Sequence, residues 1–180
     1  MININLKFIL MLTSLLTVVN ADCSKDEIMK LINKDFSKKE IKSICRDSKS
    51  NIANTEWIKL SNEKCIEYGG EIYGSTCLSN WSNANKICSM LGARLATRLE
   101  LKNSIIQCGG MIDEYDKNTK SESYKLCSKN DGFSSMYDYW SSTSCRTNKQ
   151  DAWVAYMGSG NVYNYDKEGE SYVRCVKDEK

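Results

Sequence analysis

Nine cysteines, all of them after residue 21, constrain this chain of 180 residues more than any other feature. Because their number is odd, one thiol is left over if the others pair. The chain contains no histidine, so most catalytic and zinc chemistry lacks its usual side chain. An exported chain of this size uses such cysteines mostly as crosslinks. We therefore expect a disulfide-stabilised domain in which binding is favoured over catalysis.

Residues 1–21 have the pattern of a signal peptide. Lys7 is the only charged residue before Asp22, an apolar run covers Phe8 to Val19, and small residues end the segment at Ala21. The apolar run is too short to span a bilayer, and polar residues follow it at once. We expect an exported protein, periplasmic or at the cell surface, with no transmembrane anchor after cleavage.

The charge balance argues against nucleic acid as a partner. Without Lys7 the chain has 24 basic and 23 acidic side chains, and no basic run is longer than two residues. A nucleic-acid-binding domain would show a basic patch or stripe. The sequence implies no cofactor.

Residues 22–46 predict a short helical hairpin. Ser24-Lys25-Asp26-Glu27 and Ser37-Lys38-Lys39-Glu40 are both capping boxes, so a helix begins at each. A bridge between Cys23 and Cys45 would close a loop of about 22 residues and contribute about 3 kcal/mol. Its role is open between N-terminal packing and docking onto a partner. Residues 47–56 are polar and predict a linker to a main domain at 57–180.

The main domain is expected to open with a hairpin. Trp57–Leu60 and Ile66–Tyr73 are β-prone, and Gly69-Gly70 predicts the turn. Cys65 and Cys77 flank this hairpin, so we expect them to form a disulfide.

Two helices should follow. An apolar face that includes Ala84, Ile87 and Cys88 predicts a helix from Trp81 that Gly92 ends. Thr97-Arg98-Leu99-Glu100 is a further capping box, and the second helix should end before Gly109. From Cys108 to Asp138 the chain is polar and predicts a long surface excursion, which a Cys108–Cys127 bridge could tie down. Its carboxylates do not follow the spacing of a calcium loop, so a solvated face is favoured over a metal site.

The C-terminal segment predicts an antiparallel meander. Three strands alternate in polarity, at Trp153–Met157, Asn161–Tyr165 and Tyr172–Val176, with glycine turns between them. Alternation puts Val173 and Cys175 on one face, where Cys175 can meet Cys88 and form a bridge between the first long helix and the last strand.

Several motifs follow one another between Trp81 and Val176. Besides Trp81, Ala84 and Cys88, they are Leu91-Gly92-Ala93-Arg94-Leu95-Ala96-Thr97, Glu100-Leu101, Tyr139-Trp140-Ser141-Ser142-Thr143, Ala152-Trp153, Gly160-Asn161-Val162 and Tyr172-Val173-Arg174-Cys175-Val176. In order and spacing they resemble the bacterial C-type-lectin-fold domain of unknown function found at the C-terminal end of collagen-like adhesins, the Lcl type.

The resemblance implies an α+β, C-type-lectin-like fold, with two helices flanking a small twisted antiparallel sheet and long loops available for ligands. It implies no catalytic residues. Cys145 falls in a variable loop, which makes it the candidate for the odd thiol. The chain has neither the proline-containing triplet nor the Trp-Asn-Asp triplet of calcium-dependent sugar sites, so no metal is expected.

These observations favour an exported bacterial binding or adhesion module for an unidentified protein or glycan at the cell envelope. Two alternatives stay open: a cysteine-dependent oxidase of the formylglycine-generating type, and a structural subunit of an envelope assembly. The best candidates for a binding surface are Arg146, Asn148, Lys149, Tyr156, Tyr163 and Tyr165, because tyrosine gives rigid amphipathic contact area.

Structural roles are expected for four other motif residues. Trp81, Trp140 and Trp153 should hold elements together, and Arg174 should pair with a carboxylate or a carbonyl. Ser141 to Thr143 are expected to satisfy backbone groups at a turn.

Overall fold

The computed structural model describes residues 28–29, 32, 36, 38, 41–42, 55–112 and 116–177. The chain divides into two compact units, Met1–Asn54 and Thr55–Lys180. In the first unit Ile28, Phe36 and Ile41 are buried. The expected signal peptide, the Cys23–Cys45 bridge, most of the helical hairpin and most of the linker lie outside the described residues.

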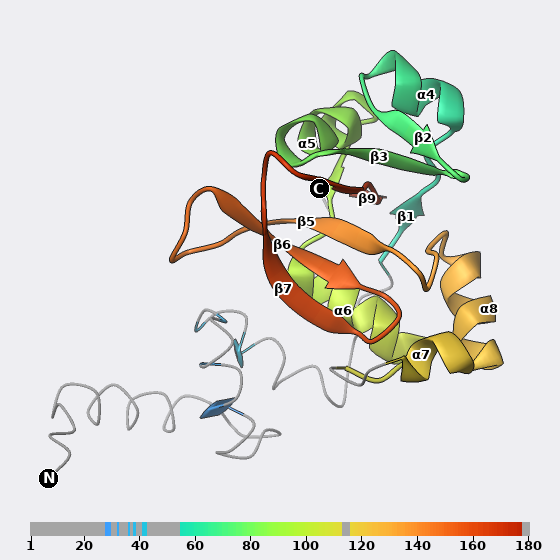
Figure 1. The fold of residues 1–180 in the computed structure, drawn as a ribbon, viewed down its shortest axis with the longest axis vertical. Coiled ribbons are helices and arrows are strands. Elements are labelled where there is room, and N and C mark those ends of the chain that lie inside the picture. The colour runs from blue at the N-terminus through green and yellow to red at the C-terminus, as the bar shows by residue number, and fades with distance from the viewer. Residues whose placement is uncertain are drawn as a thin grey trace, which may run out of the picture. The chain divides into compact units, whose positions relative to one another are not determined.

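The second unit is an α+β domain with two sheets (Figure 1). None of the helices in the described residues combines the length and hydropathy needed to cross a bilayer. The helices are α4 (Asn62–Glu67), α5 (Trp81–Met90), α6 (Arg98–Gln107), α7 (Lys117–Lys120) and α8 (Glu122–Asn130). The strands are β1 (Trp57–Ile58), β2 (Glu71–Tyr73), β3 (Thr76–Asn80), β4 (Ala93–Leu95), β5 (Asp138–Ser144), β6 (Asp151–Tyr156), β7 (Asn161–Asp166), β8 (Glu170–Tyr172) and β9 (Cys175–Lys177).

The larger sheet has the order β2-β3-β8-β5-β6-β7, and the smaller has the order β1-β9-β4. All neighbours are antiparallel except β5 and β8, which pair in parallel at Tyr139 and Tyr172. The chain leaves the larger sheet after Tyr172 and enters the smaller one at Cys175. The last strand segment therefore connects the two sheets.

The two long helices begin and end as predicted. The Asn80 side chain accepts a hydrogen bond from the Asn83 N–H at the start of α5, and Gly92 follows its end with a φ of 66°. At α6 the Thr97 and Glu100 side chains form the expected reciprocal capping box. Arg94 from β4 binds the same Glu100 carboxylate with both of its terminal nitrogens, at 2.7 and 2.8 Å, which fixes the strand against the helix.

The predicted opening hairpin is wrong, because residues 62–67 form helix α4. Ser61 caps this helix by accepting a hydrogen bond from the Lys64 N–H, and Gly69 follows the helix end with a φ of 85°. Gly69-Gly70 thus terminates a helix, and the hairpin turn lies between β2 and β3 at Gly74. A Cβ on Gly70 would lie 2.7 Å from the Cys65 sulfur, so a side chain there would collide with the disulfide.

The excursion after Cys108 is also more ordered than predicted, since it contains α7 and α8. Tyr124 and Ser128 of α8 are buried, and a disulfide ties Cys127 to Cys108. The buried Asn118 side chain accepts a hydrogen bond from the Met111 N–H and donates to the carbonyls of Met111 and Met157. Three backbone groups of two different loops are therefore satisfied by one amide.

The predicted meander is correct only for its first two strands. β7 pairs with β6, but β8 inserts between β3 and β5, and the segment then breaks at Val173-Arg174 to start β9. Ser141 to Thr143 lie within strand β5 rather than at a turn, although the register with β6 shifts between Trp140 and Ser144. Strand order depends on long-range pairing, which local alternation does not encode.

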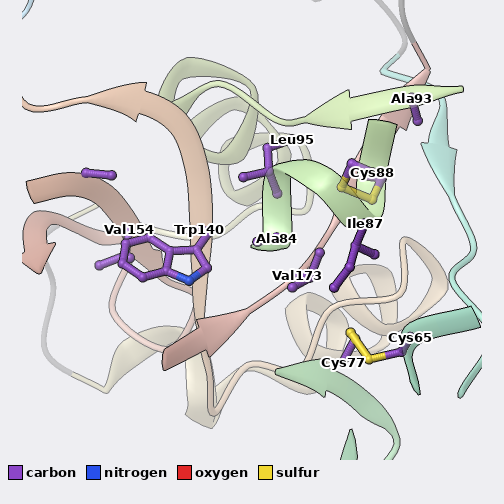
Figure 2. Packing of buried hydrophobic residues seen from close by; sticks show 12 residues of the cluster. Cys65, Cys77, Ala84, Ile87, Cys88, Ala93, Leu95, Trp140, Val154 and Val173 are labelled. Carbon is purple, nitrogen blue, oxygen red and sulfur yellow. A yellow bond between two sulfur atoms is a disulfide. The ribbon is translucent and has the colours of Figure 1, made fainter. Parts of the chain in front are cut away.

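The second unit has three disulfides among its described residues, Cys65–Cys77, Cys88–Cys175 and Cys108–Cys127, the pairs expected from the sequence. Two of them belong to one buried cluster (Figure 2). In that view Trp140 and Val154 lie at one side, the two disulfides at the other, and Ala84 and Leu95 between them. The crosslinks are therefore part of the hydrophobic core.

Removing the Cys88–Cys175 bond should destabilise the domain more than removing Cys65–Cys77. The first bond spans 87 residues and the second 12, so the entropy of the unfolded chain is restricted further by the first. We expect the double variant Cys88→Ala/Cys175→Ala to lose about 4.6 kcal/mol and Cys65→Ala/Cys77→Ala about 2.8 kcal/mol. Urea unfolding of both variants measures the difference. Because all four residues are almost fully buried, the cavity cost is similar, and a reversed order would contradict the account.

Asn118→Ala should cost about 3 kcal/mol of unfolding free energy, because it leaves buried backbone groups without their partner. Thr119→Ala is the control, since its hydroxyl donates one hydrogen bond to the nearby Asp116 carbonyl and should cost less than about 1 kcal/mol. Chemical denaturation compares the two variants. Equal losses would show that Asn118 does not hold the two loops together.

Candidate binding surface

Tyr156, Tyr163 and Tyr165 lie on one face of the larger sheet, and we call these three residues the tyrosine face. In the register of β6 and β7, Tyr163 is opposite Val154 and Tyr165 is opposite Ala152. Side chains that are opposite each other or two residues apart share a face. Tyr165 is 41% exposed, and Tyr156 and Tyr163 are partly buried. The sequence alone did not show which of these tyrosines share a face. The register of β6 and β7 puts all three on the same side of the sheet.

A hydrogen bond fixes the centre of the tyrosine face. The Tyr163 hydroxyl donates to the Asp138 carboxylate of β5 at 2.7 Å. Burial raises the pKa of Asp138 above its ordinary value, an effect that this hydrogen bond partly offsets. Burial also raises the pKa of the Tyr163 phenol, and the neighbouring carboxylate raises it further. Tyr163 is thus a neutral donor held in one orientation at physiological pH.

Tyr165 packs on the side of a rigid indole. Its ring centroid lies 5.6 Å from that of Trp140, with the planes tilted by 33°. Trp140 is fully buried, and its indole N–H donates to the Ser79 carbonyl of β3 at 2.8 Å. The exposed tyrosine therefore rests against a side chain that is itself held in place.

The predicted loop residues Arg146, Asn148 and Lys149 are exposed between β5 and β6. Lys167, just after β7, holds this loop by donating to the Lys149 carbonyl at 2.8 Å and to the Ser144 hydroxyl at 2.7 Å. Because the loop leads into Asp151 and Ala152, it lies at the Tyr165 end of the tyrosine face.

The structure separates one predicted residue from this loop. Tyr156 is at the opposite end of β6, where it is paired with Asn161 beyond Tyr163. Its ring packs near Gly158, because a Cβ on that glycine would lie 2.6 Å from the Tyr156 ring. The loop and Tyr165 therefore form one end of the surface, Tyr163 the centre and Tyr156 the other end.

Two of the motif residues with expected structural roles, Trp81 and Trp153, each lie against a cationic side chain. The Trp81 indole N–H donates to the Ser141 carbonyl at 2.7 Å, and the Lys167 ammonium lies 4.4 Å from the centroid of the Trp81 ring. The buried Arg98 guanidinium lies 4.5 Å from the centroid of Trp153.

Arg174 is buried and donates to the Asp131 carbonyl, one of the two kinds of partner expected for it. Burial lowers the pKa of its guanidinium, and the neighbouring Tyr139 and Asp131 oppose that shift. Gly132 makes room for the contact, since a Cβ there would lie 2.6 Å from the carbon at the centre of the guanidinium.

A second aromatic cluster was not predicted from the sequence. Tyr137 and Tyr172 stack with a centroid distance of 3.9 Å and an interplanar angle of 9°. Two exposed side chains lie close to this pair. Tyr73 is near Tyr172 and is 62% exposed, and Met136 precedes Tyr137 in the sequence and is 64% exposed. These residues come from β2, β8 and the segment before β5, so only knowledge of the strand order could have brought them together.

Cysteine chemistry in the described residues is limited by the disulfides. The sulfurs of Cys108 and Cys127 and the Asp131 carboxylate lie within 4.8 Å of one another, but the two sulfurs are bonded to each other and are not thiolates. Cys145 is buried outside these three disulfides, and its sulfur lies 3.3 Å from the Thr147 hydroxyl.

The fold and these contacts define a disulfide-bonded α+β domain in which Tyr163 packs against the buried cluster and Tyr165 is exposed beside Trp140. A model of the Lcl C-terminal domain matches residues 43–177, which is most of the chain. The protein therefore belongs to the Lcl C-terminal domain family, as the resemblance in its motifs suggested. No curated protein matches the chain.

Tyr163→Phe should lower the unfolding free energy by about 2 kcal/mol at pH 7, because the ionised Asp138 loses a hydrogen bond. Since the pKa of Asp138 is already raised in the folded state, the substitution raises it further. The stability difference between the variant and the wild type should shrink as the pH falls and Asp138 becomes protonated. Urea unfolding at several pH values tests this, with Tyr165→Phe as the control. A difference that does not change with pH would contradict the assignment.

Proposed function

We propose that this protein is an exported, non-catalytic binding module whose ligand is a protein or glycan of the bacterial cell envelope. The tyrosine face and the loop that contains Arg146, Asn148 and Lys149 form its ligand-contact surface. The main support for the proposal is that Asp138 holds Tyr163 by a hydrogen bond and that Tyr165 packs against Trp140. Aromatic side chains that are ordered before binding provide contact area at a low entropic cost.

Export and fold detail are part of the same proposal. Three disulfides among the described residues favour an oxidising compartment, which agrees with the leader predicted at residues 1–21. The C-type-lectin-like arrangement would explain why loops and a sheet face are displayed from a crosslinked frame. The motif order in the sequence supports that assignment of fold.

The oxidase alternative requires two neighbouring thiols that bind copper. Six cysteines of the described residues are bonded in pairs, which favours the binding module. A structural subunit of an envelope assembly is the other alternative, and it would copurify with a stoichiometric neighbour.

Tyr165→Ala should weaken ligand binding by about tenfold or more, as expected for a large aromatic contact residue, because Tyr165 is the most exposed of the three tyrosines and lies next to the loop. The ligand is first identified by screening the mature protein against glycan arrays and envelope extracts, and affinity is then measured by calorimetry. Tyr73→Ala is the control, because Tyr73 is also an exposed tyrosine and lies on β2, at the other edge of the sheet. Unchanged affinity in Tyr165→Ala together with a loss in Tyr73→Ala would move the binding site to the second aromatic cluster and overturn the proposal.

A further inference from the structure

Strand β7 forms an outer edge of the six-stranded sheet (Figure 1). It pairs with β6 over its full length, from Asp166 opposite Asp151 to Asn161 opposite Tyr156. This register has no shift or bulge, so six consecutive residues present a regular strand edge.

The direction of the β7 backbone groups follows from the hydrogen bonds of its neighbours. The Lys167 N–H donates to the Gln150 carbonyl at 2.9 Å, in the same register as the strand pair. Because alternate residues of an antiparallel strand bond to the same side, Tyr163 and Tyr165 bond toward β6. The N–H and carbonyl groups of Val162 and Asn164 therefore point away from β6, and in the described part of the chain no strand lies beyond them.

The residues of β7 themselves lack three of the devices that usually prevent pairing between proteins. Lysine, proline and bulges commonly protect exposed strand edges, but β7 has neither lysine nor a bulge and the whole chain has no proline. Asp166, at the end of β7, is its only charged residue.

We propose that β7 pairs antiparallel with β7 of a second copy of this chain, which joins two larger sheets into one continuous sheet. A two-fold axis at Asn164 places Tyr163 of one copy opposite Tyr165 of the other, twice, on the same face. Cross-strand aromatic pairs stabilise such ladders. The same register places Asp166 opposite Val162 rather than opposite a second carboxylate, so β7 is complementary to itself in both side chains and charge.

Strand β2, at the other edge of the sheet, is a poorer partner for β7 of a second copy. β2 is three residues long and begins with Glu71, so it would leave half of β7 uncovered. A contact between β7 and β2 of the next copy would also be head-to-tail and would continue as a ring of several copies or an open polymer, whereas the β7–β7 contact closes as a dimer. The dimer would align two tyrosine faces, and it needs no ligand, so it is tested independently of the proposed function.

Sedimentation velocity of the full mature chain over a range of concentrations should show a reversible monomer–dimer equilibrium. Asn164→Pro removes an N–H that points away from β6 and leaves the backbone hydrogen bonds to β6 intact, which proline at a strand edge allows. Two hydrogen bonds per dimer are lost, so the association constant should fall by about tenfold or more.

Asn164→Ala is the matched control. It loses the same side chain, including its hydrogen bond to Asp151, but keeps the backbone N–H and should remain dimeric. Hydrogen exchange of the wild-type protein gives a second readout that does not depend on a variant folding: the Val162 and Asn164 amides should become more protected as concentration rises.

Three results would overturn the inference. The first is a monomer at every concentration, with exchange at Val162 and Asn164 independent of concentration, which would mean that the edge is open or covered within one chain. The second is equal association in Asn164→Pro and Asn164→Ala. The third is growth into open-ended polymers.

Discussion

The bond between Cys88 and Cys175 is the constraint on which the rest of the domain depends. It joins α5 to β9, and β9 is both the central strand of the smaller sheet and the continuation of β8 in the larger one. One covalent link therefore fixes a helix and two sheets relative to one another. Both cysteines are fully buried beside Ile87 and Val173, so the crosslink also fills the core that it stabilises.

Much of this frame could be predicted, because its signals are local. The capping box at Thr97, the helix end at Gly92 and the inward position of Cys88 are set by neighbouring residues. The prediction failed for the elements whose structure depends on contacts between residues that are distant in the sequence. Nothing near Tyr172 in the sequence shows that β8 pairs with β3 and β5, and the β-prone residues before Gly69 became helical because Ser61 caps a turn whose Cys65 bonds to Cys77.

For the candidate surface, only the types of residue could be predicted from the sequence. Tyrosines in alternating strands are visible in the sequence, but the choice of face depends on the register with β6. The partners that hold them, Asp138 and Trp140, come from β5, which is distant in the sequence from β7. Asn118 shows the same limit, since an amide in a polar segment that suggested a solvated face is instead a buried connection between two loops. Composition identifies such residues, and only tertiary structure assigns their partners.

The central claim, that one crosslink connects both sheets and the first long helix, is tested most directly by disulfide mapping. The mature protein is purified with its thiols blocked, digested without reduction, and analysed by mass spectrometry. We expect a peptide containing Cys88 linked to a peptide containing Cys175. Linkage of either residue to another cysteine, or recovery of both in the blocked form, would contradict it.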